Sequence, residues 1–209
     1  MKSIKHLAIL GIYTLVATVG LSSFVSSELL TDGYAIGDVV KDVPLKNIDG
    51  KMVAMADYTD AKGFIVIFTC NTCPYAVASE DRIIALDAQF KDKGYPVIAI
   101  NPNNPDVQPD DTFELMQAKA ADKGFTFPYL FDQTRSMYAQ YGAKKTPHTY
   151  ILNKENGKLV VKYIGAIDDS VKSAAGVTRT FVADAVNAII NGKEVPVKET
   201  RAIGCSIKV

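Results

Sequence analysis

Two cysteines separated by two residues are the strongest chemical feature of this sequence. Cys70 and Cys73 follow the apolar run 64–68, and Pro74 comes directly after them. The apolar run lacks polar alternation, which predicts a strand buried on both faces. Pro74 fits only the first turn of a helix. The two thiols are therefore expected at a junction where a strand ends and a helix begins.

This junction should make Cys70 the more acidic of the two thiols. A free thiol has a pKa of about 8.5, and a helix N-terminus lowers it because unpaired N–H groups and the helix dipole favour the thiolate. Regular helix should begin near Cys73 and leave Cys70 just outside. We therefore expect Cys70 to attack a disulfide and Cys73 to resolve the mixed disulfide. The alternatives are a buried reduced pair, a static disulfide, or half of a metal site.

Hydrophobic periodicity and turn residues place the elements around this pair. The sequence predicts strands at 64–68, 96–100 and 129–131, a hairpin within 39–53 that turns at Asp49-Gly50, a hairpin formed by 149–153 and 158–164, a turn or short helix at 54–60, and helices at 74–91, 112–123, 134–141 and 177–190. This alternation of strands and helices predicts an α/β domain.

The loop 101–109 is polar and leaves the carboxyl end of a predicted strand. Ligands bind at that end of open α/β sheets, so the loop either lines the substrate face or is ordinary Asn/Pro turn chemistry. Asp110 or Asp111 is predicted to cap the helix that follows. The inward side chains of that helix are expected to be Phe113, Leu115, Met116 and Ala120.

The N-terminus and the composition indicate where the protein works. Lys2 and Lys5 precede an apolar run over 7–21 and then small residues, so residues 1–27 are predicted to be a secretory signal or, alternatively, an uncleaved anchor. Either would place the folded part outside the cytoplasm, in the periplasm. The chain has 23 basic and 23 acidic residues and no basic stripe, which argues against nucleic acid as a partner.

The thiol motif and the segment 145–150 (KTPHTY) resemble the thioredoxin superfamily over residues 34–191. The predicted hairpin within 39–53, which precedes the strand 64–68 and the two cysteines, is similar to that of exported TlpA/ResA-type thioredoxins and of the alkyl hydroperoxide reductase/thiol-specific antioxidant family. The resemblance implies a central mixed sheet flanked by helices, an N-terminal β-hairpin extension and a C-terminal tail over 192–209. It also implies that Pro147 is cis and lies against the two cysteines, and that the backbone of Thr146 pairs with bound substrate.

The chain departs from common thioredoxins around the thiols. Thr69 stands where many of them have Trp, the spacer is Asn71-Thr72 instead of Gly-Pro, and residues 64–68 contain no acid. Proton transfer at Cys73 must therefore use water or another acid.

Three functions are compatible with these residues. The first is a thiol–disulfide oxidoreductase that acts on protein or small-molecule disulfides, needs no cofactor and receives electrons from a membrane thiol reductase. The second is a peroxidase, although neither Gly63 nor Val66 is the proline that peroxiredoxins place seven residues before their cysteine. The third is a Cu or Zn carrier using the two cysteines and His148, which requires His148 to face the thiols. The alternative is that neighbouring backbone groups satisfy the His148 ring by hydrogen bonds. We therefore predict no metal site.

The third cysteine, Cys205, lies in the tail. Ile203 and Ile207 alternate with Gly204 and Ser206 around it, which predicts a strand that could pin the tail to a sheet edge or groove. Cys205 is then either a structural, mostly buried side chain or a second resolving thiol that takes the disulfide from the Cys70/Cys73 pair.

Overall fold

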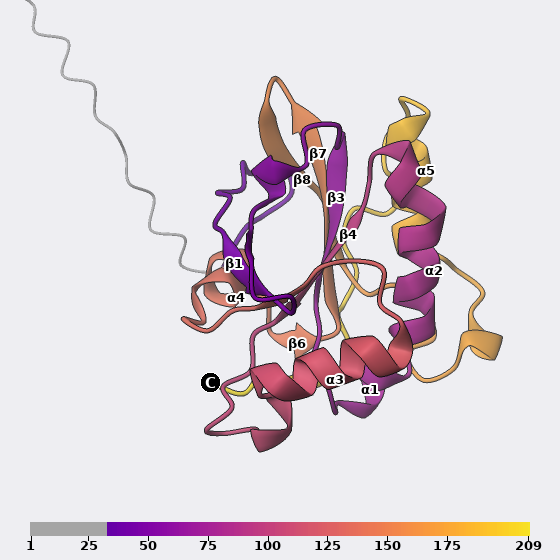
Figure 1. Ribbon diagram of the computed structural model, residues 1–209. Helices are drawn as coiled ribbons and strands as arrows, with labels where there is room; N and C mark the ends of the chain where they lie inside the picture. Colours follow the sequence, from indigo (N-terminus) through magenta and orange to yellow (C-terminus); the bar gives the residue numbers. More distant parts are fainter. Residues whose placement is uncertain (1–32) are drawn as a thin grey trace, which may run out of the picture.

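The computed structural model describes residues 33–209, and a seven-stranded mixed sheet forms its centre (Figure 1). The strand order is β2-β1-β5-β4-β3-β7-β8, with β3, β4 and β5 parallel and the other pairings antiparallel. The bounds are β1 Leu45–Asn47, β2 Met52–Val53, β3 Gly63–Phe68, β4 Val97–Asn101, β5 Tyr129–Phe131, β7 His148–Glu155 and β8 Lys158–Gly165. A separate two-stranded sheet joins β6 (Lys145–Thr146) to β9 (Cys205–Ser206).

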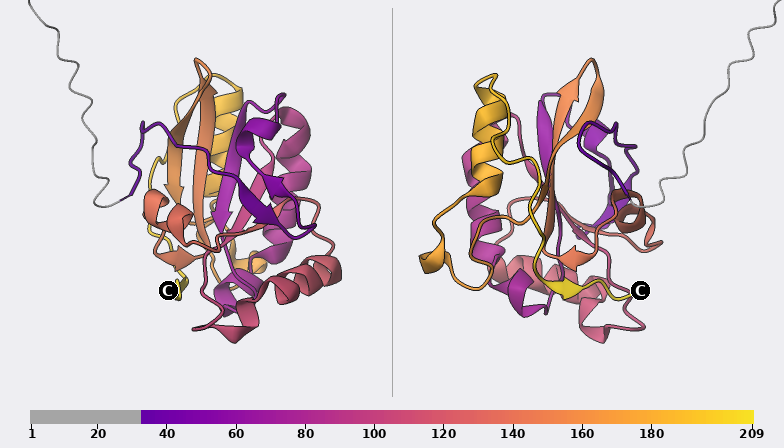
Figure 2. Two further views of the ribbon diagram at one scale, coloured as in Figure 1. Left: turned by 60° about the vertical axis from the view of Figure 1, so that its left-hand side comes forward. Right: turned by 180° about the vertical axis from the view of Figure 1, so that it is seen from behind.

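Helices cover the sheet and close the end that carries the thiols. The bounds are α1 Pro74–Val77, α2 Glu80–Phe90, α3 Phe113–Lys123, α4 Ser136–Tyr141 and α5 Phe181–Ile190, with short 3-10 helices at Met55–Asp57, Lys91–Lys93, Pro109–Asp111 and Ala174–Gly176. Helices α2 and α5 lie side by side on one face, and α4 lies on the other with the N-terminal segment (Figures 1 and 2). Helix α3 lies beside α1 at the end of the sheet.

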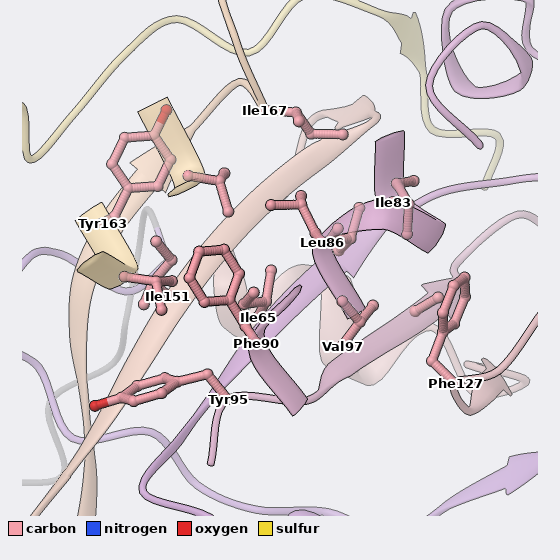
Figure 3. Close-up of a cluster of buried hydrophobic side chains, with 14 of the residues drawn as sticks. Ile65, Ile83, Leu86, Phe90, Tyr95, Val97, Phe127, Ile151, Tyr163 and Ile167 are labelled. Carbon is pink, nitrogen blue, oxygen red and sulfur yellow. The ribbon is translucent and has the colours of Figure 1, made fainter. Parts of the chain in front are cut away.

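Strand β3 divides the core into two clusters. Its side chains point to opposite faces in turn. Ile65 and Ile67 pack with α2 and α5 (Figure 3), whereas Phe64, Val66 and Phe68 pack with α4 and the N-terminal segment. Every residue of β3 is buried. An uninterrupted apolar strand is therefore required here because both of its faces are covered.

The predicted strands and both hairpins are confirmed with small changes of boundary. The predicted helix 74–91 is wrong as a single element, because it is interrupted between α1 and α2. Ser79 Oγ donates a hydrogen bond to Tyr75 O (2.8 Å), and the Ser79 N–H goes to Ala76 O instead (2.9 Å). The serine side chain thus competes with the helical hydrogen-bond pattern.

The helix predicted over 177–190 begins only at Phe181. Residues before it are held outside the helix because Asp169 Oδ1 accepts hydrogen bonds from Thr178 N (2.9 Å) and Arg179 N (3.1 Å). The carboxylate therefore satisfies these two N–H groups in a loop ahead of the helix.

The cap of α3 also differs from the prediction. Thr112 Oγ1 accepts from Leu115 N (3.3 Å), while Asp111 is directed elsewhere. Met116 and Ala120 are buried as expected, but Leu115 is 44% exposed. The predicted signal or anchor, residues 1–27, lies outside the described residues. Within 33–209 no helix is long and apolar enough to cross a membrane.

Candidate active site

The two thiols of the Cys-X-X-Cys motif sit at the strand-to-helix junction predicted from the sequence. Cys70 follows β3, and Cys73 is the N-cap of α1, where its carbonyl accepts from Val77 N (2.9 Å). Cys70 is 5% exposed and Cys73 is 6% exposed. Both sulfurs are therefore nearly closed off from solvent in this state.

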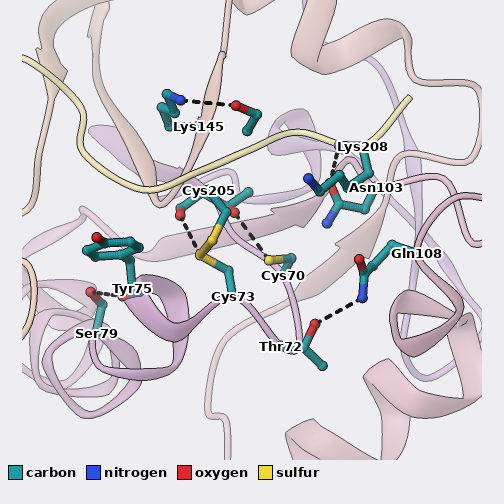
Figure 4. The surroundings of a disulfide bond; sticks show 12 residues. Cys70, Thr72, Cys73, Tyr75, Ser79, Asn103, Gln108, Lys145, Cys205 and Lys208 are labelled. Atoms are coloured by element: carbon teal, nitrogen blue, oxygen red, sulfur yellow. Dashed lines mark hydrogen bonds between the residues drawn. A yellow bond between two sulfur atoms is a disulfide. The ribbon is translucent and has the colours of Figure 1, made fainter.

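Thr146 lies against both cysteines. The Thr146–Pro147 peptide is cis, as the resemblance implied. Cys70 Sγ is 3.2 Å from Thr146 Oγ1, and Cys73 Sγ is 3.2 Å from Thr146 O (Figure 4). That carbonyl can accept a hydrogen bond from Cys73 when its thiol is reduced. A single residue before β7 thus contacts both members of the pair.

The disulfide of this structure joins Cys73 to Cys205, and Cys70 is a free thiol. The two bonded residues are 132 positions apart in the chain, with a Cα–Cα distance of 6.0 Å. Cys205 is half-buried and packs against Cys70, Cys73 and Ala76. It belongs to the same cluster as the motif cysteines and is not an unpaired core side chain.

The expected lowering of the Cys70 pKa is not found in this state, and Cys73 offers no comparison because it is disulfide-bonded. Burial raises the pKa of the Cys70 thiol, and the charge of Asp111 raises it further. The Thr146 hydroxyl and the backbone N–H groups of Cys73 and Thr72 act in the opposite direction. Desolvation outweighs these donors because a thiolate loses its hydration in a closed site, and α1 has only four residues.

A buried polar network behind the motif fixes its spacer. Asp111 Oδ1 accepts from Asn71 N (2.7 Å) and from Asn101 Nδ2 (3.1 Å), and Asp111 Oδ2 accepts from Asn103 Nδ2 (2.6 Å). The Asn71 side chain donates to Asp110 O (2.8 Å) and accepts from Tyr129 Oη (2.9 Å). Asn71 is therefore a structural anchor of the loop that carries both thiols.

The polar loop 101–109 lines the same site. Asn103 Oδ1 accepts from Lys208 N (2.8 Å), and Asn104 N donates to Lys208 O (2.7 Å). The loop thus connects the network behind Asn71 to the C-terminal tail. The loop also shows ordinary turn chemistry, because Asp106 N donates to Asn104 Oδ1 (3.1 Å) and Val107 N donates to Asn104 O (3.0 Å). That it lines a substrate face stays a prediction.

Comparisons with known proteins agree with this geometry. Residues 36–163, more than half of the chain, match the AhpC/TSA family. The chain belongs to that family. The thiol-disulfide oxidoreductase ResA of Halalkalibacterium halodurans is 24% identical over 136 residues, which are 65% of this chain and 72% of that ResA.

Solved structures extend the likeness of this AhpC/TSA protein to the whole fold. A conserved protein of Geobacillus kaustophilus matches with a TM-score of 0.77 and 32% identity, covering 84% of this chain and 92% of that one. A protein of Sinorhizobium meliloti 1021 matches with a TM-score of 0.77 and 29% identity, covering 84% and 95%. The predicted thioredoxin-like α/β fold with its mixed sheet is confirmed.

His148 is held by its own surroundings in this AhpC/TSA protein. Its Nδ1 accepts from Lys144 N (3.4 Å), and its ring lies 4.8 Å from the Tyr150 ring. Burial lowers its pKa to about 4, and the Lys144 charge acts in the same direction. Among residues 33–209 no group of three His, Cys, Asp or Glu side chains could hold a metal ion. The backbone-satisfied reading of His148 is confirmed, and the metal-carrier alternative has no supporting cluster there.

The sequence reasoning missed the acid of the site. The sequence predicts that Asp110 or Asp111 caps a helix, yet the Asp111 carboxylate lies in the wall behind Cys70. The signal available in the sequence was an asparagine-rich loop at the carboxyl end of β4, ending in two acidic residues. Nothing in the local pattern shows which of these acids turns inward.

Proposed function

We propose that this AhpC/TSA protein is a thiol–disulfide oxidoreductase in which Cys70 attacks and Cys73 resolves. The single observation that supports it most is the contact of both sulfurs with Thr146 beside the cis Pro147. The distant likeness to ResA, whose name states this activity, points the same way. An exchange reaction needs two thiols that can reach one sulfur in turn, and a spacing of two residues supplies them.

The reaction requires the reduced protein, with three thiols. The Cys70 thiolate attacks one sulfur of the substrate disulfide, a bond forms between them, and the other substrate sulfur leaves as a thiolate that takes up a proton. Cys73 then attacks the Cys70 sulfur, which forms Cys70–Cys73 and releases the second substrate thiol. The substrate gains two electrons and the protein loses two. The Thr146 hydroxyl and nearby N–H groups stabilise the thiolate of Cys70.

The proposal includes the setting of the reaction. The substrates are protein or small-molecule disulfides, and the backbone of Thr146 pairs with a bound peptide. The basic start and the apolar run 7–21 favour export to the periplasm. An oxidising compartment needs a dedicated source of electrons, for which a membrane thiol reductase is the proposed donor.

Turnover of a disulfide-linked peptide by residues 28–209 tests this function. We expect Cys70→Ser to abolish turnover because no other thiol makes the first attack. Cys73→Ser should trap a mixed disulfide on Cys70, visible by mass spectrometry under non-reducing conditions. Full activity of Cys70→Ser would refute the assignment. Rapid consumption of hydrogen peroxide without disulfide turnover would favour the peroxidase alternative instead.

A further inference from the structure

The C-terminal tail is fixed across the thiol end of the molecule at successive points. Ile164 N donates to Lys198 O (3.0 Å), and Thr200 N donates to Ile164 O (3.0 Å), so the tail first follows the edge strand β8. It then pairs with β6 as the antiparallel strand β9, with Cys205 opposite Thr146. Beyond β9, Lys208 is held by the loop 101–109. Figure 4 shows this segment passing directly over Cys70 and Cys73.

The tail can approach the backbone of Thr146 on β6 because residue 204 is a glycine. A Cβ atom added at Gly204 would overlap the carbonyl oxygen of Thr146 and lie 2.7 Å from its carbonyl carbon. Both atoms belong to the backbone and cannot move aside like a flexible side chain. The residue before the tail cysteine must therefore lack a side chain for the tail to reach Thr146 and Cys73.

We propose that residues 203–208 are an internal, displaceable ligand of the active site, in which Cys205 competes with Cys70 for the sulfur of Cys73. The tail takes the backbone edge of Thr146 that, under the proposed function on which this inference rests, belongs to a bound peptide. The preferred external ligand is then an extended segment with Gly-Cys at its centre, bound as an added strand.

The exchange is balanced within one molecule. The Cys70 thiolate attacks Cys73 Sγ, a Cys70–Cys73 bond forms, and the Cys73–Cys205 bond breaks. Cys205 leaves as a thiolate and takes up a proton equivalent to the one that Cys70 lost. No electrons enter or leave, so the tail-closed and tail-open forms are isomers of one oxidised protein. Their sulfurs already share one cluster, so the attack needs no large rearrangement.

The tail contributes to the burial of the cluster that contains Cys70. Cys205 packs on the cluster that contains Cys70, and burial raises the pKa of that thiol. Departure of the tail would restore solvent around Cys70 and favour its thiolate. The tail thereby couples access of a peptide to activation of the attacking sulfur.

Disulfide mapping of the fully oxidised protein after an acid quench tests the exchange. We expect the wild type to contain both Cys73–Cys205 and Cys70–Cys73. Gly204→Val retains all three cysteines but blocks docking, so its Cys73–Cys205 fraction should fall at least tenfold. Met52→Ala changes an exposed side chain on β2, outside the site and the tail, and should keep the wild-type distribution. Only one of the two disulfides in the wild type, or an unchanged distribution in Gly204→Val, would overturn the proposal.

Competition for the edge is tested by removing residues 203–209, which keeps the Thr200 contacts with β8. If the tail is docked on Thr146 about nine times in ten in the reduced protein, removing it should lower the KM for a Gly-Cys peptide disulfide on the order of tenfold, because only the undocked fraction binds. An unchanged or higher KM would contradict competition. If no variant reduces the peptide, the proposed function fails, while the mapping still decides whether Cys205 exchanges.

Discussion

At the scale of residues, burial raises the pKa of Cys70 and the charge of Asp111 behind it raises this pKa further. The carboxylate accepts from three N–H groups, of Asn71, Asn101 and Asn103, and is fully buried. It holds the spacer in place, yet its negative charge also raises the pKa of Cys70. The Asp111 side chain therefore affects both the position of the spacer between the cysteines and the pKa of the Cys70 thiol.

Replacing Asp111 by Asn should separate these two effects. Removing the charge should lower the pKa of Cys70, measured from the pH dependence of alkylation by iodoacetamide in the reduced protein. The new amide N–H group would face the N–H donors that the carboxylate now accepts from. The free energy of unfolding should therefore fall by about 2–4 kcal/mol. Asp110→Asn is the matched control, because Asp110 is exposed and uses its backbone carbonyl to hold Asn71. Equal Cys70 pKa values in the two variants would show that burial alone raises it.

At the scale of elements, α4 is positioned by an acid that precedes it. Asp132 accepts from the backbone N–H groups of Ser136 (3.1 Å), Met137 (2.9 Å) and Tyr138 (3.0 Å). Helix α4 in turn supplies Tyr141, whose carbonyl accepts from Tyr150 Oη (2.8 Å) on β7. The helix start therefore supports the segment that leads into Thr146.

Asp132→Ala should lower the free energy of unfolding by about 2–3 kcal/mol, because one buried and two part-buried N–H groups lose their acceptor. Asp132→Asn keeps one acceptor oxygen and should lose less. Urea denaturation of the reduced proteins measures both. Wild-type stability of Asp132→Ala would contradict the role given to this carboxylate.

At the scale of the molecule, stability should depend on the protonation of His148. Burial lowers its folded pKa to about 4, below the ordinary histidine pKa of 6.5. The unfolded chain therefore binds the proton more readily, and stability is complete above pH 6.5 and falls as the pH drops toward 4. The full difference corresponds to about 3 kcal/mol.

His148→Gln should flatten this dependence, because glutamine offers the Lys144 N–H an acceptor without a titrating group. Denaturation curves between pH 7 and pH 4 should show the wild type losing up to about 3 kcal/mol more than the variant. Carboxylates titrate equally in both proteins, so the difference between the two isolates the histidine. Parallel pH profiles would contradict the assignment.

The sequence by itself determined the elements whose residues interact locally. The unbroken apolar run predicted β3, and glycine-containing turns at Asp49-Gly50 and Asn156-Gly157 predicted both hairpins. Pro74, directly after the cysteines, placed the thiols at a helix start. Hydrophobic periodicity and turn chemistry act over a few neighbouring residues, so they are visible in the linear chain. The thioredoxin resemblance added the cis peptide between Thr146 and Pro147.

Only the tertiary structure decided how distant groups meet at the site. Sequence could not choose between the readings of Cys205, which bonds to Cys73 across 132 positions, nor show that Asp111 turns toward Cys70. The sequence also predicted a single helix over 74–91, whereas the structure has two helices separated at Ser79. Each of these outcomes depends on burial and on hydrogen-bond partners that the fold brings together. Burial even reversed the expected direction of the Cys70 pKa, because desolvation depends on every element packed around the thiol.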